Sequence, residues 1–352
     1  MNKKLLLTEN EYSIWKYEGV PDEVVEFFKK INWGSEGAVY ERININELIP
    51  QLHDAHLVSV NTGDTIQATA IFCKSDIDLQ GLKFKVEYIR YFAASDEIRG
   101  KKLIKHFATK VMELVKSDTT AKTIYIGCIE NGNIRSYKVV ENAGYERMGL
   151  LKVNAFSRFY PKAHANIERV KDEQSKKEVI SLLAQQYDDY ALRHFHYIFL
   201  KDNYFVIREQ GEIVAGCQLH PVRWVINNMP GFSGKIIMNV LPYTPFINKL
   251  FNPKKFDFLC FEGIYFKPGH IDKLYQLFEG LLAQEKMNAS LFWLGENCAT
   301  RKQILEHGQL GLLNNFVKKS GVIVMASYQN MSAEEIELVK SKTLYASGFD
   351  YI

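Results

Sequence analysis

The sequence lacks any apolar run that could cross a membrane, since a spanning helix needs about 18 or more consecutive apolar residues. Near the N-terminus only three leucines separate Lys4 from Thr8, which is too few for the apolar core of a signal peptide. A strong charge bias is also missing, because lysine and arginine exceed aspartate and glutamate by only three charges. We therefore expect a cytoplasmic protein with neither a membrane nor a nucleic-acid partner.

Cysteine is scarce as well, and its distribution argues against two kinds of site. The five cysteines are far apart and none forms a Cys-x-x-Cys pair, so neither a disulfide framework nor a structural zinc site is expected. The one close histidine pair is His194-Phe195-His196. On a strand it would point two imidazoles to one face, but no carboxylate or cysteine cluster accompanies it. We expect no bound metal.

The chain has the average composition of a globular protein, and it is long enough for two domains. Of its 352 residues, 47% are apolar and 24% are charged, which excludes wholesale disorder. At roughly 100–200 residues per domain, this length predicts two domains. Residues 161–171 are polar and show no clear period. We therefore expect domains at 1–160 and 172–352, joined by a linker at 161–171.

The first half reads as mixed strands and helices. A hairpin is predicted where two apolar runs flank the turn signal Asn61-Thr62-Gly63-Asp64. After a strand over 84–94, apolar residues recur from Ile104 to Val115 at three- and four-residue spacings, which indicates an amphipathic helix. The other elements expected are strands over 57–60, 66–72 and 124–129, a short helix over 135–142 that ends at Gly144, and further strands from 145 to about 160.

The second half begins with a helix expected over 172–190 and then repeats this order of elements. Its segment Glu296–Arg301 stands where the first half has Glu130–Arg135, and the two share Glu, Asn and Arg in register. The repeated order predicts a weak internal duplication. The elements concerned are a hairpin of 204–208 and 213–219, a strand over 258–266, a helix over 271–282, a strand over 290–294 and a short helix closed by His307-Gly308.

The turn Glu97–Ile104 is a candidate anion site. It connects a predicted strand to a predicted helix, so unpaired backbone N–H groups and the positive end of the helix dipole meet there. Arg99, Lys101 and Lys102 add positive charge at the same point. The other reading is a solvated basic first turn whose apolar stripe faces the core, and spacing alone does not choose between the two.

Two segments in this half resemble the GNAT superfamily of acyl-CoA-dependent N-acyltransferases. The first is Arg99-Gly100-Lys101-Lys102-Leu103-Ile104, similar to the family's Arg/Gln-x-x-Gly-x-Gly/Ala turn, whose amides hold the pyrophosphate of coenzyme A. The second is Asn133–Tyr145, similar to the family's Asn-centred segment with its Tyr-x-x-x-Gly-Phe-like ending. The resemblance covers most of the first half and implies an α+β fold, with two GNAT-like domains that each contain a mixed, mainly antiparallel sheet flanked by helices.

The resemblance also implies which residues bind the cofactor, expected to be acetyl-CoA as acyl donor. A splayed strand would supply backbone contacts to the pantetheine arm and polarise the thioester carbonyl. Asn133 would cap the following helix, hydrogen-bond the pantetheine arm, or do both. The full implied set is Phe92, Ala93, Ala94, Arg99, Gly100, Lys101, Lys102, Leu103, Ile104, Asn133 and Ser136.

The sequence departs from the family's pattern at the turn and at the general acid. Lys102 and Ile104 replace turn glycines, and a Cβ there crowds a phosphate that approaches the backbone. Val140 stands where many members have a tyrosine that protonates the leaving thiolate. Tyr137, one turn earlier, is a candidate substitute, and water is another.

Amine acylation also needs a base, since an ammonium ion is not a nucleophile. By analogy the candidates are Glu87 and Glu130; the alternative for Glu87 is a surface carboxylate paired with Lys85 or Arg90.

The sequence therefore predicts an N-acetyltransferase that transfers acetyl from acetyl-CoA to an amine of an unknown acceptor, with a possible homodimer. Its second half resembles the fold only in the order of elements, without an Arg-x-x-Gly turn, and is expected to be a degenerate copy. The alternative is a non-catalytic GNAT-fold binding or scaffold protein that has lost the cofactor. A third reading, aminoacyl-tRNA as donor, gets no support from the near-neutral charge.

Overall fold

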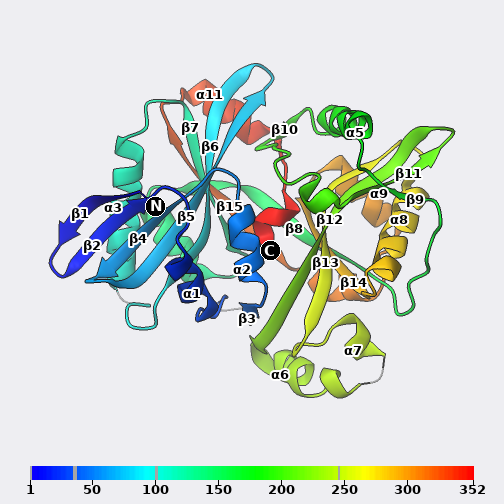
Figure 1. Ribbon diagram of the computed structural model, residues 1–352, viewed down its shortest axis with the longest axis horizontal. Helices are drawn as coiled ribbons and strands as arrows, with labels where there is room; N and C mark the ends of the chain where they lie inside the picture. The colour runs from blue at the N-terminus through cyan, green and yellow to red at the C-terminus, as the bar shows by residue number, and fades with distance from the viewer. Residues whose placement is uncertain (1, 35–37, 100–101, 245) are drawn as a thin grey trace. The chain divides into compact units, whose positions relative to one another are not determined.

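The computed structural model describes residues 2–34, 38–99, 102–244 and 246–352. The chain forms two compact units (Figure 1). Unit 1 consists of Met1–Gly149 together with Ile323–Ser341, and unit 2 of Leu150–Val322 together with Lys342–Ile352. A late strand and helix of the chain therefore complete the first unit.

Unit 1 is built mainly from strands, with one helix of 16 residues and several shorter helices among the described residues. A 3₁₀ turn at Ile49–Gln51 follows the second helix. The elements are β1 (Lys3–Glu9), β2 (Tyr12–Tyr17), α1 (Asp22–Lys29), β3 (Val39–Arg42), α2 (Ile45–Leu48), β4 (Ala55–Thr62), β5 (Thr65–Leu79), β6 (Leu82–Ala94), α3 (Lys102–Ser117), β7 (Thr123–Glu130), α4 (Ile134–Asn142), β15 (Gly321–Gln329) and α11 (Ala333–Ser341).

The sheet of unit 1 has the order β1-β2-β4-β5-β6-β7-β15. Neighbours from β1 to β6 pair antiparallel, whereas β6 and β7 pair parallel with α3 as their crossover. The predicted stripe of α3 is confirmed, since Ile104, Phe107 and Val111 are buried in the core between this helix and the sheet. That core fixes where α3 begins relative to the end of β6.

Unit 2 has the same kinds of element and ends in a short tail. Three 3₁₀ turns lie at Leu200–Asp202, Leu241–Tyr243 and Gly348–Tyr351. The elements are β8 (Glu146–Ser157), which begins in unit 1, then β9 (Ile167–Arg169), α5 (Glu173–Gln186), β10 (Tyr190–Ala191), β11 (Tyr204–Glu209), β12 (Glu212–Asn228), α6 (Gly231–Asn239), α7 (Ile247–Leu250), β13 (Phe256–Phe266), α8 (Ile271–Gln284), β14 (Ala289–Gly295), α9 (Ala299–His307), α10 (Leu313–Val317) and β16 (Thr343–Leu344).

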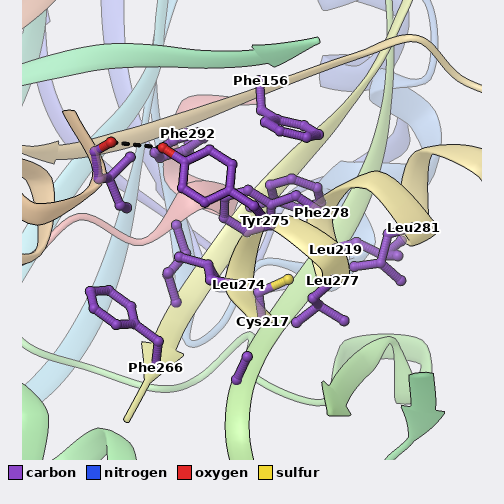
Figure 2. Packing of buried hydrophobic residues seen from close by; sticks show 14 of the residues in the cluster. Phe156, Cys217, Leu219, Phe266, Leu274, Tyr275, Leu277, Phe278, Leu281 and Phe292 are labelled. Atoms are coloured by element: carbon purple, nitrogen blue, oxygen red, sulfur yellow. Dashed lines mark hydrogen bonds between the residues drawn. The ribbon is translucent and has the colours of Figure 1, made fainter. Parts of the chain in front are cut away.

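The main sheet of unit 2 has the order β8-β14-β13-β12-β11-β9, in which only β13 and β14 pair parallel. Helix α8 covers one face of it and buries Leu274, Phe278 and Leu281 (Figure 2). Figure 2 also shows the Tyr275 hydroxyl, which donates to the carbonyl of Ile304 at 2.7 Å. The rings of Phe261 and Phe278 stack at 4.4 Å between centroids, so helix and sheet form one close-packed core.

The compact units differ from the domains expected at 1–160 and 172–352. The division falls within β8 because this strand continues from one unit into the other. Residues 323–341 return to unit 1 because β15 lies beside β7 in the sheet. The segment 161–171, expected as a linker, contains β9, which pairs with β11.

The segment His194–His196 does not lie on a strand. These residues follow a turn at Leu192, whose φ is 62°, and the two imidazole rings stack at 5.0 Å. Among the described residues, no group of three or more His, Cys, Asp or Glu side chains is placed to hold a metal ion. All five cysteines are free thiols. In the described part of the chain, no helix is both long and apolar enough to span a membrane.

Candidate functional site

Strands β6 and β7 pair over only part of their length. Their ladder runs from Lys85–Thr123 to Ile89–Gly127. Beyond it β6 continues to Ala94 and β7 to Glu130. Over the described residues the two strands therefore part at their carboxyl ends, and the edge of β6 at Phe92–Ala94 that faces β7 has no ladder partner there.

A bulge in β6 lies where the ladder ends. Ile71 pairs with Arg90 and Thr69 with Ala93, so Tyr91 and Phe92 together oppose one residue of β5. Tyr91 takes a left-handed φ of 48°, a backbone conformation uncommon outside glycine. The bulge directs the side chain of Phe92 outward, where 42% of it is exposed, and buries Tyr91.

The turn from β6 into α3 is held by hydrogen bonds to β5. The amide of Ser95 donates to the Gln67 carbonyl at 2.8 Å, and its hydroxyl donates to the Gln67 side-chain oxygen at 2.6 Å. The Arg99 guanidinium donates to the Ala94 carbonyl at 3.4 Å and lies 3.5 Å from the Asp96 carboxylate. The predicted binding residues Gly100 and Lys101 lie outside the described residues.

The remaining turn residues divide between solvent and core. Lys102 is exposed, Leu103 packs partly against the core, and Ile104 is a buried core residue. Because the Ile104 side chain packs with Phe107, it points into the core. The branched side chain of Ile104, which was expected to crowd a phosphate at this turn, is therefore turned toward the core. Exposed Lys102 leaves a positive charge at the first turn of α3.

Helix α4 begins at a confirmed cap. The side chain of Asn133 accepts a hydrogen bond from the Ser136 amide at 3.0 Å, which satisfies one N–H of the first turn. Tyr137 and Val140 lie on the next turn, and both pack half-buried against the core shared with α3. Tyr137 therefore shares with Val140 the face of α4 that packs on this core.

Glu130 ends β7 in a polar, nearly buried position. It accepts a hydrogen bond from the hydroxyl of Tyr40 in β3, at 3.3 Å. Burial raises the pKa of Glu130, while the Tyr40 hydroxyl and the Arg42 guanidinium act to lower it. Burial likewise raises the pKa of Tyr40 to about 12, so this phenol keeps its proton at neutral pH. A carboxyl with a raised pKa at the open end of the strands has the properties of a general base.

An aromatic and guanidinium cluster, which the sequence reasoning missed, adjoins this carboxyl through Tyr40 and Arg42. The Arg42 guanidinium lies 5.1 Å from the ring of Trp33 and 5.1 Å from the ring of Tyr91. Trp33 and Tyr91 meet edge to face at 5.6 Å. Its members come from the segment before β3, from β3 and from the bulge of β6. No local motif signals their proximity.

Glu87 lies elsewhere and is not a surface carboxylate, so that alternative is wrong. Only 7% of it is exposed, and it lies within the β6–β7 ladder opposite Tyr125. One oxygen of the Glu87 carboxyl lies 3.8 Å from a ring nitrogen of His56. Burial raises the pKa of Glu87. The structure therefore places Glu130, and not Glu87, where the two strands part.

Unit 2 repeats the bulge but fills the opening beside it. Its β13–β14 ladder contains Leu259–Ser290 and Cys260–Leu291, and Gly263 and Ile264 form a bulge opposite one residue of β12. The carbonyls of these two residues accept hydrogen bonds from the hydroxyls of Tyr204 and Tyr187, at 2.9 and 2.5 Å. In this copy the strand edge is thus satisfied by the unit's own side chains.

The tail of unit 2 contacts the same strands. The Ser347 hydroxyl and the Phe349 amide both donate to the buried carboxylate of Glu262 in β13, at 2.7 and 3.0 Å. Leu344 lies against Gly295 at the end of β14. A small cavity lies beside these contacts and is lined, among others, by Tyr187, Trp293 and Tyr345.

Comparison with known proteins gives matches of structure only. No protein-family model matches the sequence, and no curated protein matches it. The N-myristoyltransferase of Saccharomyces cerevisiae with bound myristoyl-CoA matches with a TM-score of 0.61 at 9% identity, over 98% of this chain and 90% of that one. A second structure of that enzyme gives 0.59 at 9% identity, with 98% and 86% covered. A tandem GNAT protein from the clavulanic acid biosynthesis pathway gives 0.48 at 10%, with 79% and 84% covered.

At this identity the likeness shows the fold alone. The chain has the α+β, GNAT-type fold of the matched N-myristoyltransferase structures. The resemblance of Arg99–Ile104 and Asn133–Tyr145 to the family's motifs predicted this fold. The predicted duplication is confirmed with it, since both units carry the same bulge, parallel ladder and crossover helix.

Proposed function

We propose that the protein is an acyl-CoA-dependent N-acyltransferase, with the thioester bound by unit 1 and an amine as acceptor. The observation that carries this proposal is the parting of β6 and β7 beside Glu130. An extended pantetheine arm can pair with the open edge of β6 at Phe92–Ala94, and the diphosphate would lie at the first turn of α3, near Arg99 and Lys102. The matched N-myristoyltransferase structure, which holds myristoyl-CoA, supports the donor class.

In the proposed reaction Glu130 takes a proton from the acceptor ammonium. The neutral amine then attacks the thioester carbonyl, whose oxygen is polarised by a backbone N–H of the open β6 edge. The new C–N bond forms as the C–S bond breaks, the thiolate takes a proton from Tyr137 or from water, and the proton that the attacking nitrogen then loses returns to that donor through water. Burial prepares Glu130 for this role by raising its pKa toward the working pH.

Acetyl-CoA is the acyl donor we propose first. The same experiment tests which length of acyl group the protein accepts. Calorimetric titration of the full chain with acetyl-, octanoyl- and myristoyl-CoA should give saturable heat with at least one thioester. Arg99→Gln and Lys102→Gln should each weaken binding several-fold, because each removes a cation near the diphosphate. Lys138→Gln, an exposed lysine of α4, is the matched control and should bind normally.

A non-catalytic binding protein is the second candidate, and Val140 favours it because valine has no proton for the leaving thiolate. The same titration separates the two. Absence of heat with every thioester at high protein concentration contradicts the transferase proposal. Saturable heat with a thioester, followed by release of free thiol when amines are added, supports it.

A further inference from the structure

The connection between β12 and β13 is far longer than its counterpart in unit 1. Between β5 and β6 the chain needs only the turn Gln80-Gly81. Between β12 and β13 it runs from Met229 to Lys255 and forms α6, a 3₁₀ turn and α7. Figure 1 shows α6 and α7 together at the ends of these two strands. A two-residue turn joins the same pair of strands in the other copy, so strand pairing does not require this segment.

The segment from Met229 to Lys255 exposes several large apolar side chains, one after another along the chain. The exposed fractions are 41% for Ile236, 54% for Val240, 72% for Tyr243 and 57% for Phe246. Backbone hydrogen bonds from Val240 to Ile236 and from Tyr243 to Val240 place the first three on successive turns. Tyr160, from the segment after β8, is also exposed. Exposed apolar groups gathered in this way mark an interaction surface.

Lysines accompany the exposed aromatic rings. The Lys249 ammonium lies 4.4 Å from the centroid of the Tyr160 ring and 5.9 Å from that of Phe246. The Lys254 ammonium lies 5.2 Å from the Tyr243 ring and donates to its hydroxyl at 3.2 Å. We call these seven residues, Tyr160, Ile236, Val240, Tyr243, Phe246, Lys249 and Lys254, the α6–α7 surface.

The chain around this surface is poor in acidic residues, although Asp257, the first one after it, pairs with Lys255 at 3.7 Å. From Ile213 to Phe256 the sequence contains no aspartate or glutamate, but it contains Arg223, Lys235, Lys249, Lys254 and Lys255. The whole chain has almost equal numbers of acidic and basic residues, so this stretch departs strongly from its average. The local field therefore attracts a negatively charged partner.

We propose that the α6–α7 surface docks peripherally on an anionic phospholipid bilayer. Apolar and aromatic side chains would enter the boundary between headgroups and acyl chains, and the lysines would reach the lipid phosphates. Such a contact needs no spanning helix, so it revises the expectation of no membrane partner only at this surface.

Other occupants fit less well. A symmetric contact with a second copy would bring Lys249 and Lys254 of both chains together, with no carboxylate in this stretch to pair with them. A nucleic acid would attract the lysines but would not bury Ile236 or Val240. A bilayer with anionic headgroups accounts for both the charge and the apolar side chains.

The test is co-sedimentation of the full chain with lipid vesicles. Vesicles of phosphatidylcholine with about one third phosphatidylglycerol should bind the protein, pure phosphatidylcholine vesicles should bind it weakly, and added salt should reduce the binding. Each lysine near an anionic surface changes partitioning about fivefold, so Lys249→Gln combined with Lys254→Gln should reduce it roughly 25-fold. Tyr243→Ser combined with Phe246→Ser should reduce it at least tenfold without any change of charge.

Matched controls lie on the same unit. Phe316→Ser in α10 removes another exposed aromatic ring and Lys302→Gln in α9 another exposed lysine, and both should bind like the unchanged protein. Equal binding to neutral and anionic vesicles, or an equal loss in the Phe316→Ser control, overturns the proposal. A concentration-dependent dimer that Phe246→Ser abolishes, without vesicle binding, also overturns it and assigns the surface to a second copy.

Discussion

Tyr91 in β6 and Gly263 in β13 occupy the same position in the two units. Each is the first residue of a bulge that places two residues opposite one, and their φ angles are 48° and 54°. A left-handed conformation costs a non-glycine residue about 1–2 kcal/mol. Packing of the Tyr91 ring against Phe28 and Trp33, at 5.5 and 5.6 Å, offsets that cost in unit 1.

Gly263 has no comparable room, so Gly263→Ala should destabilise the protein. A Cβ there would lie 2.5 Å from the terminal methyl carbon of Ile198. Backbone strain and crowding together should lower the free energy of unfolding by about 2–3 kcal/mol, measured by urea denaturation. Gly63→Ala is the matched control, because Gly63 has a φ of 56° and open space around it. It should cost only about 1 kcal/mol, and equal losses in the two variants would contradict the crowding argument.

Elements set by local patterns could be predicted from the sequence. The three- and four-residue spacing from Ile104 to Val115 identified the buried face of α3, since a helix returns to one face at that period. Asn133 was a predicted cap because its short amide can reach the first-turn N–H groups. Motif resemblance supplied the rest of the fold class.

Contacts between distant segments could not be predicted in this way. Tyr40 and Glu130 are 90 residues apart, and only the folded sheet brings them together. The identical residues of Glu130–Arg135 and Glu296–Arg301 also align the two halves with an error of one residue. The caps that correspond in structure are Asn133 and Cys298, each of which accepts from the amide three residues later. The identities in these six residues arise by chance, and they hid the alignment of the two halves that the structure shows.

Replacing Glu130 should separate catalysis from binding. We expect Glu130→Gln to lower kcat for acyl transfer at least 100-fold, because an amide cannot accept the proton of the ammonium, while the affinity for acyl-CoA stays within about twofold. Glu141→Gln, at an exposed position of α4, is the control and should leave kcat unchanged. Full activity of Glu130→Gln would remove this residue from the mechanism.

Tyr40→Phe should shift the pH dependence of the same reaction. The Tyr40 hydroxyl lowers the pKa of Glu130 by donating to its carboxylate, so its loss raises that pKa further. A base with a higher pKa is protonated at higher pH. The acidic limb of the pH–rate profile should therefore move upward by roughly half a unit to one unit, with the plateau rate kept. A downward shift, or none, would contradict the assigned hydrogen bond.

Histidine 56 should make unit 1 sensitive to acid. Burial lowers the pKa of His56 to about 3, and Lys74 and Lys16 add to this effect. Between the ordinary imidazole pKa of 6.5 and about 3 the unfolded chain binds a proton that the folded chain does not, so stability falls as the pH falls. The slope should approach about 1.4 kcal/mol per pH unit below roughly pH 6.

His56→Phe tests this claim. The phenyl ring can keep the stacking on Phe72, whose ring lies 5.1 Å away, and it removes two buried nitrogens that have no hydrogen-bond partner. Urea denaturation at a series of pH values should then show a flatter profile between pH 6 and 4. His53→Asn, at an exposed position of the same segment, should leave the profile unchanged. Glu87→Gln removes the neighbouring carboxyl, whose raised pKa has the opposite effect.

Asn133 is expected to hold two functions that substitutions can separate. Asn133→Ala removes the acceptor for the Ser136 amide and should cost about 1 kcal/mol of stability, whereas Asn133→Ser keeps a capping oxygen and should cost a few tenths. If the carboxamide also binds the pantetheine arm, Asn133→Ser should weaken acyl-CoA binding several-fold although the fold is retained. Titration and denaturation of both variants decide the matter. Unchanged affinity in a stable Asn133→Ser protein leaves this residue as a cap alone.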